Sequence, residues 1–95
     1  MRIIALATLR AFWERNPDAE MPLRAWYAMA SRVVWKTSVE VKAAYRNASF
    51  TANNRVVFNI KGNSFRLVVK VRFKNNLVLI EWAGTHDEYD RLKLA

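Results

Sequence analysis

A histidine and a tyrosine near the carboxyl end of the chain are the residues best suited to proton transfer. His86 is the only histidine, and Tyr89 follows it by three residues. Within one helix this spacing places both side chains on the same face. An imidazole and a phenol side by side can move protons next to a phosphate group, which predicts acid–base chemistry on a phosphodiester. The simpler interpretation, in which a lone histidine only packs at a helix end, stays open.

A basic strand pattern precedes these two residues and supplies positive charge. Residues 55–74 include six Lys or Arg and no Asp or Glu. Over 65–73 apolar side chains alternate with largely basic ones, and the preceding strand alternates in the same way. This period of two predicts half-buried strands of a sheet whose solvent-facing side meets an anion. On that open side we place Arg55, Val57, Asn59, Lys61, Arg66, Val68, Lys70, Arg72 and Lys74.

Three strands are predicted at about 55–61, 64–74 and 77–83. Two short Gly/Asn pairs, at 62–63 and 75–76, separate them and suit tight hairpin turns, so the strands form an antiparallel meander. Lys61 and Arg66 flank the first turn and, in a tight register, project to the same open face. The third strand is apolar on both sides, which indicates a central strand covered partly on both faces.

The amino-terminal half predicts two helices that pack on this sheet. Residues 2–5 suit a short strand, and apolar residues at helical spacing follow over 6–15. Pro17 ends that pattern and, with Asn16 as N-cap, starts a second helix well. The two helices then form a hairpin against the sheet. The apolar stripe of the second helix comprises Leu23, Trp26, Tyr27, Ala30, Val33 and Val34.

The remaining segments are short or poorly patterned. Residues 36–54 combine a short helical turn at VEVKAAY with NASFTANN, a polar, turn-prone stretch that we expect to be exposed. Thr85 as N-cap and Glu88 three residues later predict a capping box, which starts a short final helix before a basic tail. Most aromatic residues fit core positions, whereas Tyr45 and Trp82 could stack on a base if exposed.

Size and charge limit the class of protein. A length of 95 residues, 53% of them hydrophobic, predicts one compact α+β domain over 1–95. The formal net charge of +8 favours a polyanionic partner, nucleic acid or an acidic protein. Cysteine is absent, and one histidine beside Asp87, Glu88 and Asp90 does not match a zinc or calcium pattern, so no metal or cofactor is expected. No apolar run is long enough to span a bilayer, so we expect a cytoplasmic protein without membrane contact.

Three stretches of the chain resemble one known family. The run VVFNIKGNSFRLVVKVRF followed by GTHDEYD resembles the HigB-type toxins of bacterial type II toxin–antitoxin systems, within the RelE-like superfamily. FWERNPDAEMPLRAWY resembles the helical hairpin of the same proteins, so the similarity covers nearly the whole chain. The resemblance implies a compact fold in which two amino-terminal helices pack on one face of an antiparallel sheet. That sheet would consist of the three-stranded meander and a short amino-terminal strand, followed by a short carboxyl-terminal helix.

The resemblance also implies an mRNA endoribonuclease that acts on the translating ribosome and arrests growth. Such enzymes are generally metal-free, and the RNA 2′-OH attacks the adjacent phosphate. A cognate HigA-like antitoxin with a helix-turn-helix domain neutralises the toxin, and operator DNA is bound only through their complex. Matched to the motifs, Lys61 and Arg66 would stabilise the transition-state charge, while His86 and Tyr89 would transfer protons. RNA would be bound by Arg55, Asn59, Asn63, Lys70, Arg72 and Lys74.

Two alternatives to an enzyme stay open. The same basic sheet could bind nucleic acid without cleaving it, in which case binding would weaken with salt and no products would form. Its charge could also complement an acidic protein, in which case nucleic acid would not compete for the basic face.

Overall fold

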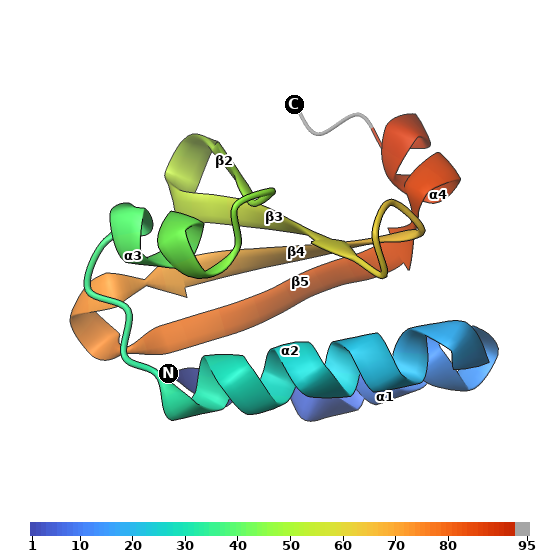
Figure 1. Ribbon diagram of the computed structural model, residues 1–95, viewed down its shortest axis with the longest axis horizontal. Helices are drawn as coiled ribbons and strands as arrows, with labels where there is room; N and C mark the ends of the chain where they lie inside the picture. Colours follow the sequence, from blue (N-terminus) through green and yellow to red (C-terminus); the bar gives the residue numbers. More distant parts are fainter. Residues whose placement is uncertain (93–95) are drawn as a thin grey trace.

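The computed structural model describes residues 1–92, which form an α+β fold around a five-stranded sheet (Figure 1). The strand order is β1-β5-β4-β3-β2. The predicted meander of β3, β4 and β5 is antiparallel, and β1 pairs with β5 in parallel. The fold class is therefore confirmed; the end of the predicted basic tail lies outside the described residues. The strands are β1 (Arg2–Ile4), β2 (Ser49–Thr51), β3 (Arg55–Ile60), β4 (Phe65–Arg72) and β5 (Leu77–Thr85).

The edge strand β2 lies in a stretch that the sequence predicts to be an exposed loop. Its residues 49–51 pair antiparallel with residues 55–57 of β3. All three residues of β2 are exposed, so no alternation of buried and exposed side chains marks the strand in the sequence. The prediction of a loop is corrected here, while the helical turn expected just before it is α3 (Ser38–Ala44).

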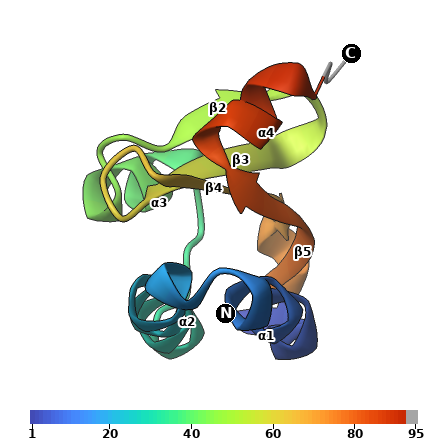
Figure 2. The same cartoon turned by 90° about the vertical axis from the view of Figure 1, so that its right-hand side faces the viewer.

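Helices divide the sheet into a covered face and an open face (Figures 1 and 2). α1 (Leu6–Arg15) and α2 (Glu20–Arg32) lie side by side under one face, joined by the short 3-10 helix Pro17–Ala19. α4 (His86–Arg91) follows β5 and stands on the other side of the sheet from the two long helices. Among residues 1–92, α4 therefore stands at one end of the open face, on the opposite side of the sheet from α1 and α2.

The helical hairpin differs from its prediction at both ends of the second helix. Asn16 does not cap that helix; its Nδ2 donates to the Phe12 carbonyl at the end of α1 instead. Pro17 opens the 3-10 helix, where its missing N–H removes no helical hydrogen bond. At the far end Val33 is already extended, with φ −102° and ψ 160°, so Val33 and Val34 lie beyond α2.

An aromatic cluster around Phe58 fills the space beneath β3. The Phe58 ring centroid lies 5.4 Å from that of Trp26 and 5.1 Å from that of Tyr45, and Trp35 stacks on it at 6.4 Å. The Tyr45 ring is thus part of the core, and burial raises the pKa of its phenol. Tyr45 is half-buried, with its ring packed against Phe58 and Trp35, and its stacking on a base stays a prediction. Other buried residues of the core include Leu9, Phe12, Trp13, Leu23, Val56, Ile60, Phe65, Leu67, Val69, Val71 and Val78.

A β-bulge explains the mixed pattern of β5. β4 pairs Val69 with Ile80 but Val68 with Trp82, so Glu81 is an extra residue in β5. The extra residue exchanges the two sides of the strand: before it the even-numbered residues face the core, and after it the odd-numbered ones do. β5 is central, as predicted, but the bulge rather than burial on both faces produces its pattern. Trp82 consequently lies on the open face.

Candidate active site

One corner of the open face brings together residues from separate parts of the chain. There the turn 61–64 between β3 and β4 meets the end of β5 and the start of α4. The backbone N–H of His86 donates to the Ser64 carbonyl at 3.0 Å. Across the sheet, Arg66 lies between Asn59 on β3 and Gly84 on β5. We call these five residues the Arg66 corner.

Arg66 is held at this corner by backbone carbonyls rather than by acidic side chains. Its Nη1 donates to the Asn63 carbonyl at 3.2 Å and to the Phe65 carbonyl at 3.3 Å. Among residues 1–92 it makes no ion pair. Its full charge and its remaining N–H groups therefore stay available to a phosphate. Asn63, predicted to bind RNA through its side chain, contributes here through its carbonyl.

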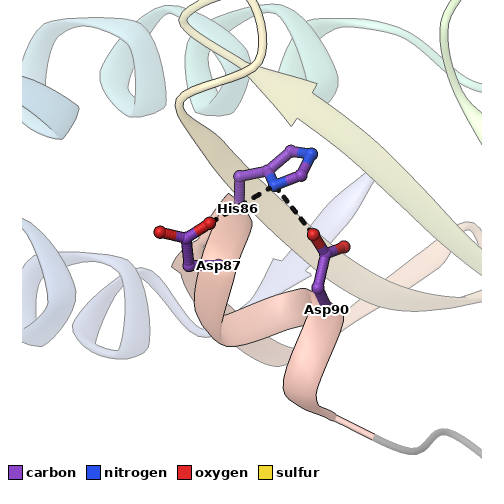
Figure 3. A group of neighbouring side chains, drawn as sticks. All are labelled: His86, Asp87 and Asp90. Carbon is purple, nitrogen blue, oxygen red and sulfur yellow. Dashed lines mark ion pairs between the residues drawn. The ribbon is translucent and has the colours of Figure 1, made fainter.

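His86 begins α4, and acidic side chains of the same helix hold its imidazole (Figure 3). Nδ1 lies 3.0 Å from Asp90 Oδ2 and 3.9 Å from Asp87 Oδ1. A carboxylate next to Nδ1 keeps a proton on that nitrogen and leaves Nε2 of the neutral ring as the acceptor. The side chain is 43% exposed, so a substrate can reach it. The sequence signal for this pair is the four-residue spacing of His86 and Asp90, although the acidic residues alone suggest only helix-start charge.

The same three side chains also have donor atoms close enough for a cation. One ligand atom each from His86, Asp87 and Asp90 lies within 4.8 Å of the others. The short approaches of His86 Nδ1 to the two carboxylates already account for this clustering without an ion. The expectation that the chain uses no metal therefore stays a prediction.

Trp82 and Tyr89 form an aromatic pair beside the corner. Their ring centroids lie 6.0 Å apart, with the planes tilted by 51°. Gly84 makes this arrangement possible, because a Cβ at that position would lie 2.3 Å from the Trp82 ring. Trp82, which the sequence left open for base stacking, thus supports Tyr89. Sequence reasoning missed both the support and the need for glycine, since the bulge hid the face on which Trp82 lies.

The start of α4 is fixed by the predicted capping box. Thr85 Oγ1 accepts from the Glu88 N–H at 3.1 Å, and Glu88 Oε1 accepts from the Thr85 N–H at 2.8 Å. The box joins α4 rigidly to the end of β5 and so sets the position of His86 relative to Arg66.

Lys61 lies at the same end of the sheet but points to the covered side. The turn spans four residues instead of the predicted two, and Lys61 and Gly62 both have left-handed backbone, with φ of 53° and 61°. Lys61 Nζ lies 3.5 Å from Asp18 Oδ2 in the helical hairpin. The residue also lines a cavity of about 270 Å³ together with Trp26. The expectation that Lys61 and Arg66 project to one face is therefore corrected.

The middle of the open face is less basic and less exposed than its pattern predicts. Arg55 Nε pairs with Glu81 Oε1 at 2.6 Å, so the bulge residue reaches across β4 and neutralises an arginine expected to bind RNA. Val57 and Val68, on the same face, are only 4% and 2% exposed. The other predicted RNA-binding cations, which make no ion pair in the part of the chain described, are Lys70, Arg72 and Lys74.

The sequence also matches a known family. The family model of HigB toxins, described as the RelE-like toxic component of a toxin–antitoxin system, matches residues 19–92. The chain belongs to the HigB toxin family. The match includes α2, α3, α4 and strands β2 to β5, so every residue of the Arg66 corner lies inside it. No curated protein matches the chain.

Membership of the HigB family confirms the resemblance seen in the motifs. The protein is the toxin of a toxin–antitoxin system, and an antitoxin is its implied partner. In residues 1–92, none of the helices combines the length and the apolar character needed to cross a membrane.

Proposed function

We propose that this HigB-family toxin is an endoribonuclease that cuts mRNA on the translating ribosome. The Arg66 corner is the observation that carries the proposal. There an arginine without an acidic partner in residues 1–92 lies near an imidazole oriented by Asp90, at the end of an open sheet face. A phosphodiester bound at this corner would meet a cation and a proton-transfer group together.

The proposed reaction needs only groups of the toxin and the RNA. The RNA 2′-OH loses its proton to a base and attacks the adjacent phosphorus. The bond from phosphorus to the 5′ oxygen breaks, and that oxygen takes a proton from an acid. The products are a 2′,3′-cyclic phosphate and a 5′-hydroxyl end. The transition state carries extra negative charge on the phosphoryl oxygens, which a fixed cation stabilises.

We assign each role by what the side chain offers. His86 Nε2 acts as the base, because the Nδ1 proton is directed to Asp90. The Tyr89 phenol, supported by Trp82, acts as the acid toward the 5′ oxygen. Arg66 binds the phosphoryl oxygens. After each cleavage, Tyr89 takes up a proton from solvent, and His86 releases to solvent the proton that it took from the 2′-OH.

Lys61 takes part only after it leaves Asp18. The two side chains are 49% and 81% exposed, and an exposed pair of this kind contributes at most about 1 kcal/mol. An RNA phosphate can therefore compete with Asp18 for the ammonium group. We propose Lys61 as a second, mobile cation that the turn delivers when RNA binds.

The partners of the reaction follow from the same proposal. Ribosome-bound mRNA is the substrate, in the cytoplasm, and a HigA-like helix-turn-helix antitoxin is the inhibitor. Operator DNA is bound only through the toxin–antitoxin complex. The net charge of +8 supports a partner with acidic surfaces in each case.

Induction of the toxin in bacterial cells, followed by mapping of transcript 5′ ends, tests the proposal. Cuts are expected inside translated reading frames. Arg66→Ala should lower cleavage by about 10²-fold or more, as loss of a transition-state donor does, without changing the thermal unfolding midpoint. Growth arrest with intact transcripts would overturn the proposal. Salt-sensitive RNA binding without products, even with ribosomes present, would favour the non-catalytic alternative.

A further inference from the structure

A hollow lined by two arginines lies at the opposite end of the open face from α4. It has a volume of about 490 Å³ and is lined by Arg2, Arg72, Asn75, Leu77 and Leu79. The strand register explains the arrangement: Leu77 on β5 pairs with Arg2 on β1 at one side and with Arg72 on β4 at the other. Two arginines therefore flank a leucine floor in one row across the sheet.

The two arginines of this hollow have no acidic partner in residues 1–92. Arg2 and Arg72 are both exposed. A neighbouring hollow of about 340 Å³ shares Arg72 and adds Lys74. Like charges without a counter-charge repel one another and cost stability, and an anion bound between them would remove that cost.

The residues that line the hollow fit one nucleotide of a nucleic-acid strand. Two guanidinium groups suit the oxygens of a phosphate, and the Asn75 amide adds donors and an acceptor. Leu77 and Leu79 are half-buried and offer an apolar surface for a sugar or base. A phosphodiester with an attached nucleoside uses all of these groups, whereas a free inorganic anion would leave the leucine floor unused.

The distance between the hollow and the Arg66 corner determines how many nucleotides of one RNA strand could connect them. Arg66 and Arg72 are six residues apart on β4, which at about 3.4 Å per residue corresponds to roughly 20 Å. We propose that the hollow formed by Arg2 and Arg72 binds a phosphate of the mRNA strand a few nucleotides away from the cleaved bond. This inference rests on the proposed function, because the Arg66 corner is taken as the place of cleavage.

RNA binding by charge-matched variants tests the inference. The probe is a series of 2′-O-methyl single-stranded RNAs shortened one nucleotide at a time, which lack the attacking hydroxyl and stay intact. Arg2→Gln/Arg72→Gln is compared with Arg10→Gln/Arg32→Gln, which removes equal charge from the helical hairpin on the other side of the sheet. Circular dichroism melts establish that both variants fold.

The expected result depends on RNA length. For long RNAs the Arg2/Arg72 variant should bind more weakly, with the slope of log affinity against log salt reduced by about 0.7 for each phosphate that the variant no longer binds. For RNAs too short to extend from the Arg66 corner it should match the control variant. Equal affinities of the two variants at all lengths would overturn the inference, even if the toxin cleaves RNA.

Two further outcomes separate this inference from the proposed function and from a ribosomal RNA contact. If the wild type never cleaves RNA but the Arg2/Arg72 variant still shows the length-dependent loss of RNA affinity, the phosphate subsite stands and the proposed function fails. If the loss appears only on ribosomes, and equally with and without bound mRNA, the phosphate belongs to ribosomal RNA and the inference is overturned.

Discussion

At the scale of single residues, the Arg66 and His86 side chains have opposite surroundings. Arg66 hydrogen-bonds to two backbone carbonyls, so its position is fixed while its charge is not cancelled. His86 instead has a carboxylate 3.0 Å from Nδ1. A carboxylate beside Arg66 would weaken its attraction for phosphate, whereas the one beside His86 selects the nitrogen that accepts a proton. Each arrangement suits the role that we propose for the residue.

His86 and Asp90 are predicted to act as a unit. His86→Gln should lower the rate of mRNA cleavage by about 10²–10⁴-fold, as loss of a proton-transfer group does. Asp90→Asn should cost less, because the imidazole stays in place with its orientation weakened. The double variant should then be no slower than His86→Gln alone, since Asp90 works through His86. Cleavage rates on ribosome-bound mRNA measure this, and additive losses would mean that Asp90 acts independently.

The ion pair of Lys61 with Asp18 predicts that substitutions of its two members affect the cleavage rate differently. Lys61→Ala should slow cleavage, because the phosphate loses its second cation. Asp18→Asn should leave the rate unchanged or raise it, since it releases Lys61 from an exposed pair. If Lys61 only ties the turn to the helical hairpin, both substitutions will instead lower the thermal unfolding midpoint alike and leave the rate unchanged.

At the scale of elements, the bulge in β5 and the capping box of α4 build the corner. The bulge moves Trp82 to the open face, and the box fixes His86 at the end of the same strand. Gly84 lies between these two features, where its missing side chain leaves room for the Trp82 ring. The position of Tyr89 therefore depends on residues of β5 as well as on its own helix.

Gly84→Ala tests this dependence. The new methyl group would lie 2.3 Å from the Trp82 ring, so the ring that packs on Tyr89 must shift. We expect a loss of about 1–3 kcal/mol in the free energy of unfolding, typical of overpacking, together with slower cleavage. Trp82→Phe in the same chain should recover much of the stability by making room. Unchanged stability of the single variant would contradict the close approach of the two residues.

A sequence pattern reveals a strand only where buried and exposed residues alternate regularly along its whole length. β3 and β4 each keep one side in the core over their whole length, so alternation located both strands and the charged face of β4. In β5 the extra residue Glu81 reverses which side chains face the core. In β2 all three residues are exposed, so buried and exposed positions do not alternate. The direction of Lys61 was also hidden, because left-handed backbone at a lysine has no sequence signature.

Local sequence patterns likewise predict only part of the candidate site. Motifs placed Arg66 and His86 in one region, and the helical spacing linked His86 to Tyr89. The pairing of Arg55 with Glu81 depends on a register across three strands, which no local pattern contains. Asp90, by contrast, was within reach of sequence reasoning through its spacing from His86.

At the scale of the whole molecule, the sheet separates two kinds of interaction. Its covered face packs against α1 and α2 through apolar and aromatic side chains, including the cluster around Phe58. Its open face carries cations without ion pairs in residues 1–92 near both ends, with two buried valines and an ion pair between them. Stability therefore depends mainly on one face, while the proposed function places RNA binding on the other, so most substitutions should affect only one of the two.

The alkaline limit of stability tests the packing of the covered face. Burial raises the pKa of the Tyr45 phenol above its ordinary value of about 10. Above that value the unfolded chain loses this proton before the folded chain does, so the free energy of unfolding falls as pH rises. Denaturant unfolding at a series of pH values should show a shallower fall for Tyr45→Phe than for the wild type or for Tyr27→Phe. Equal slopes in all three would contradict burial of the phenol.

In the proposed reaction, the RNA 2′-OH attacks a phosphate bound at the Arg66 corner. Ribosomes carrying an mRNA with a single 2′-deoxynucleotide on the 5′ side of a mapped cleavage site test it most directly. We predict that cleavage at this bond disappears while neighbouring sites are still cut, and that the products of unmodified mRNA end in a 2′,3′-cyclic phosphate and a 5′-hydroxyl. Continued cleavage at the deoxynucleotide, or products with 5′-phosphate ends, would contradict attack by the 2′-OH.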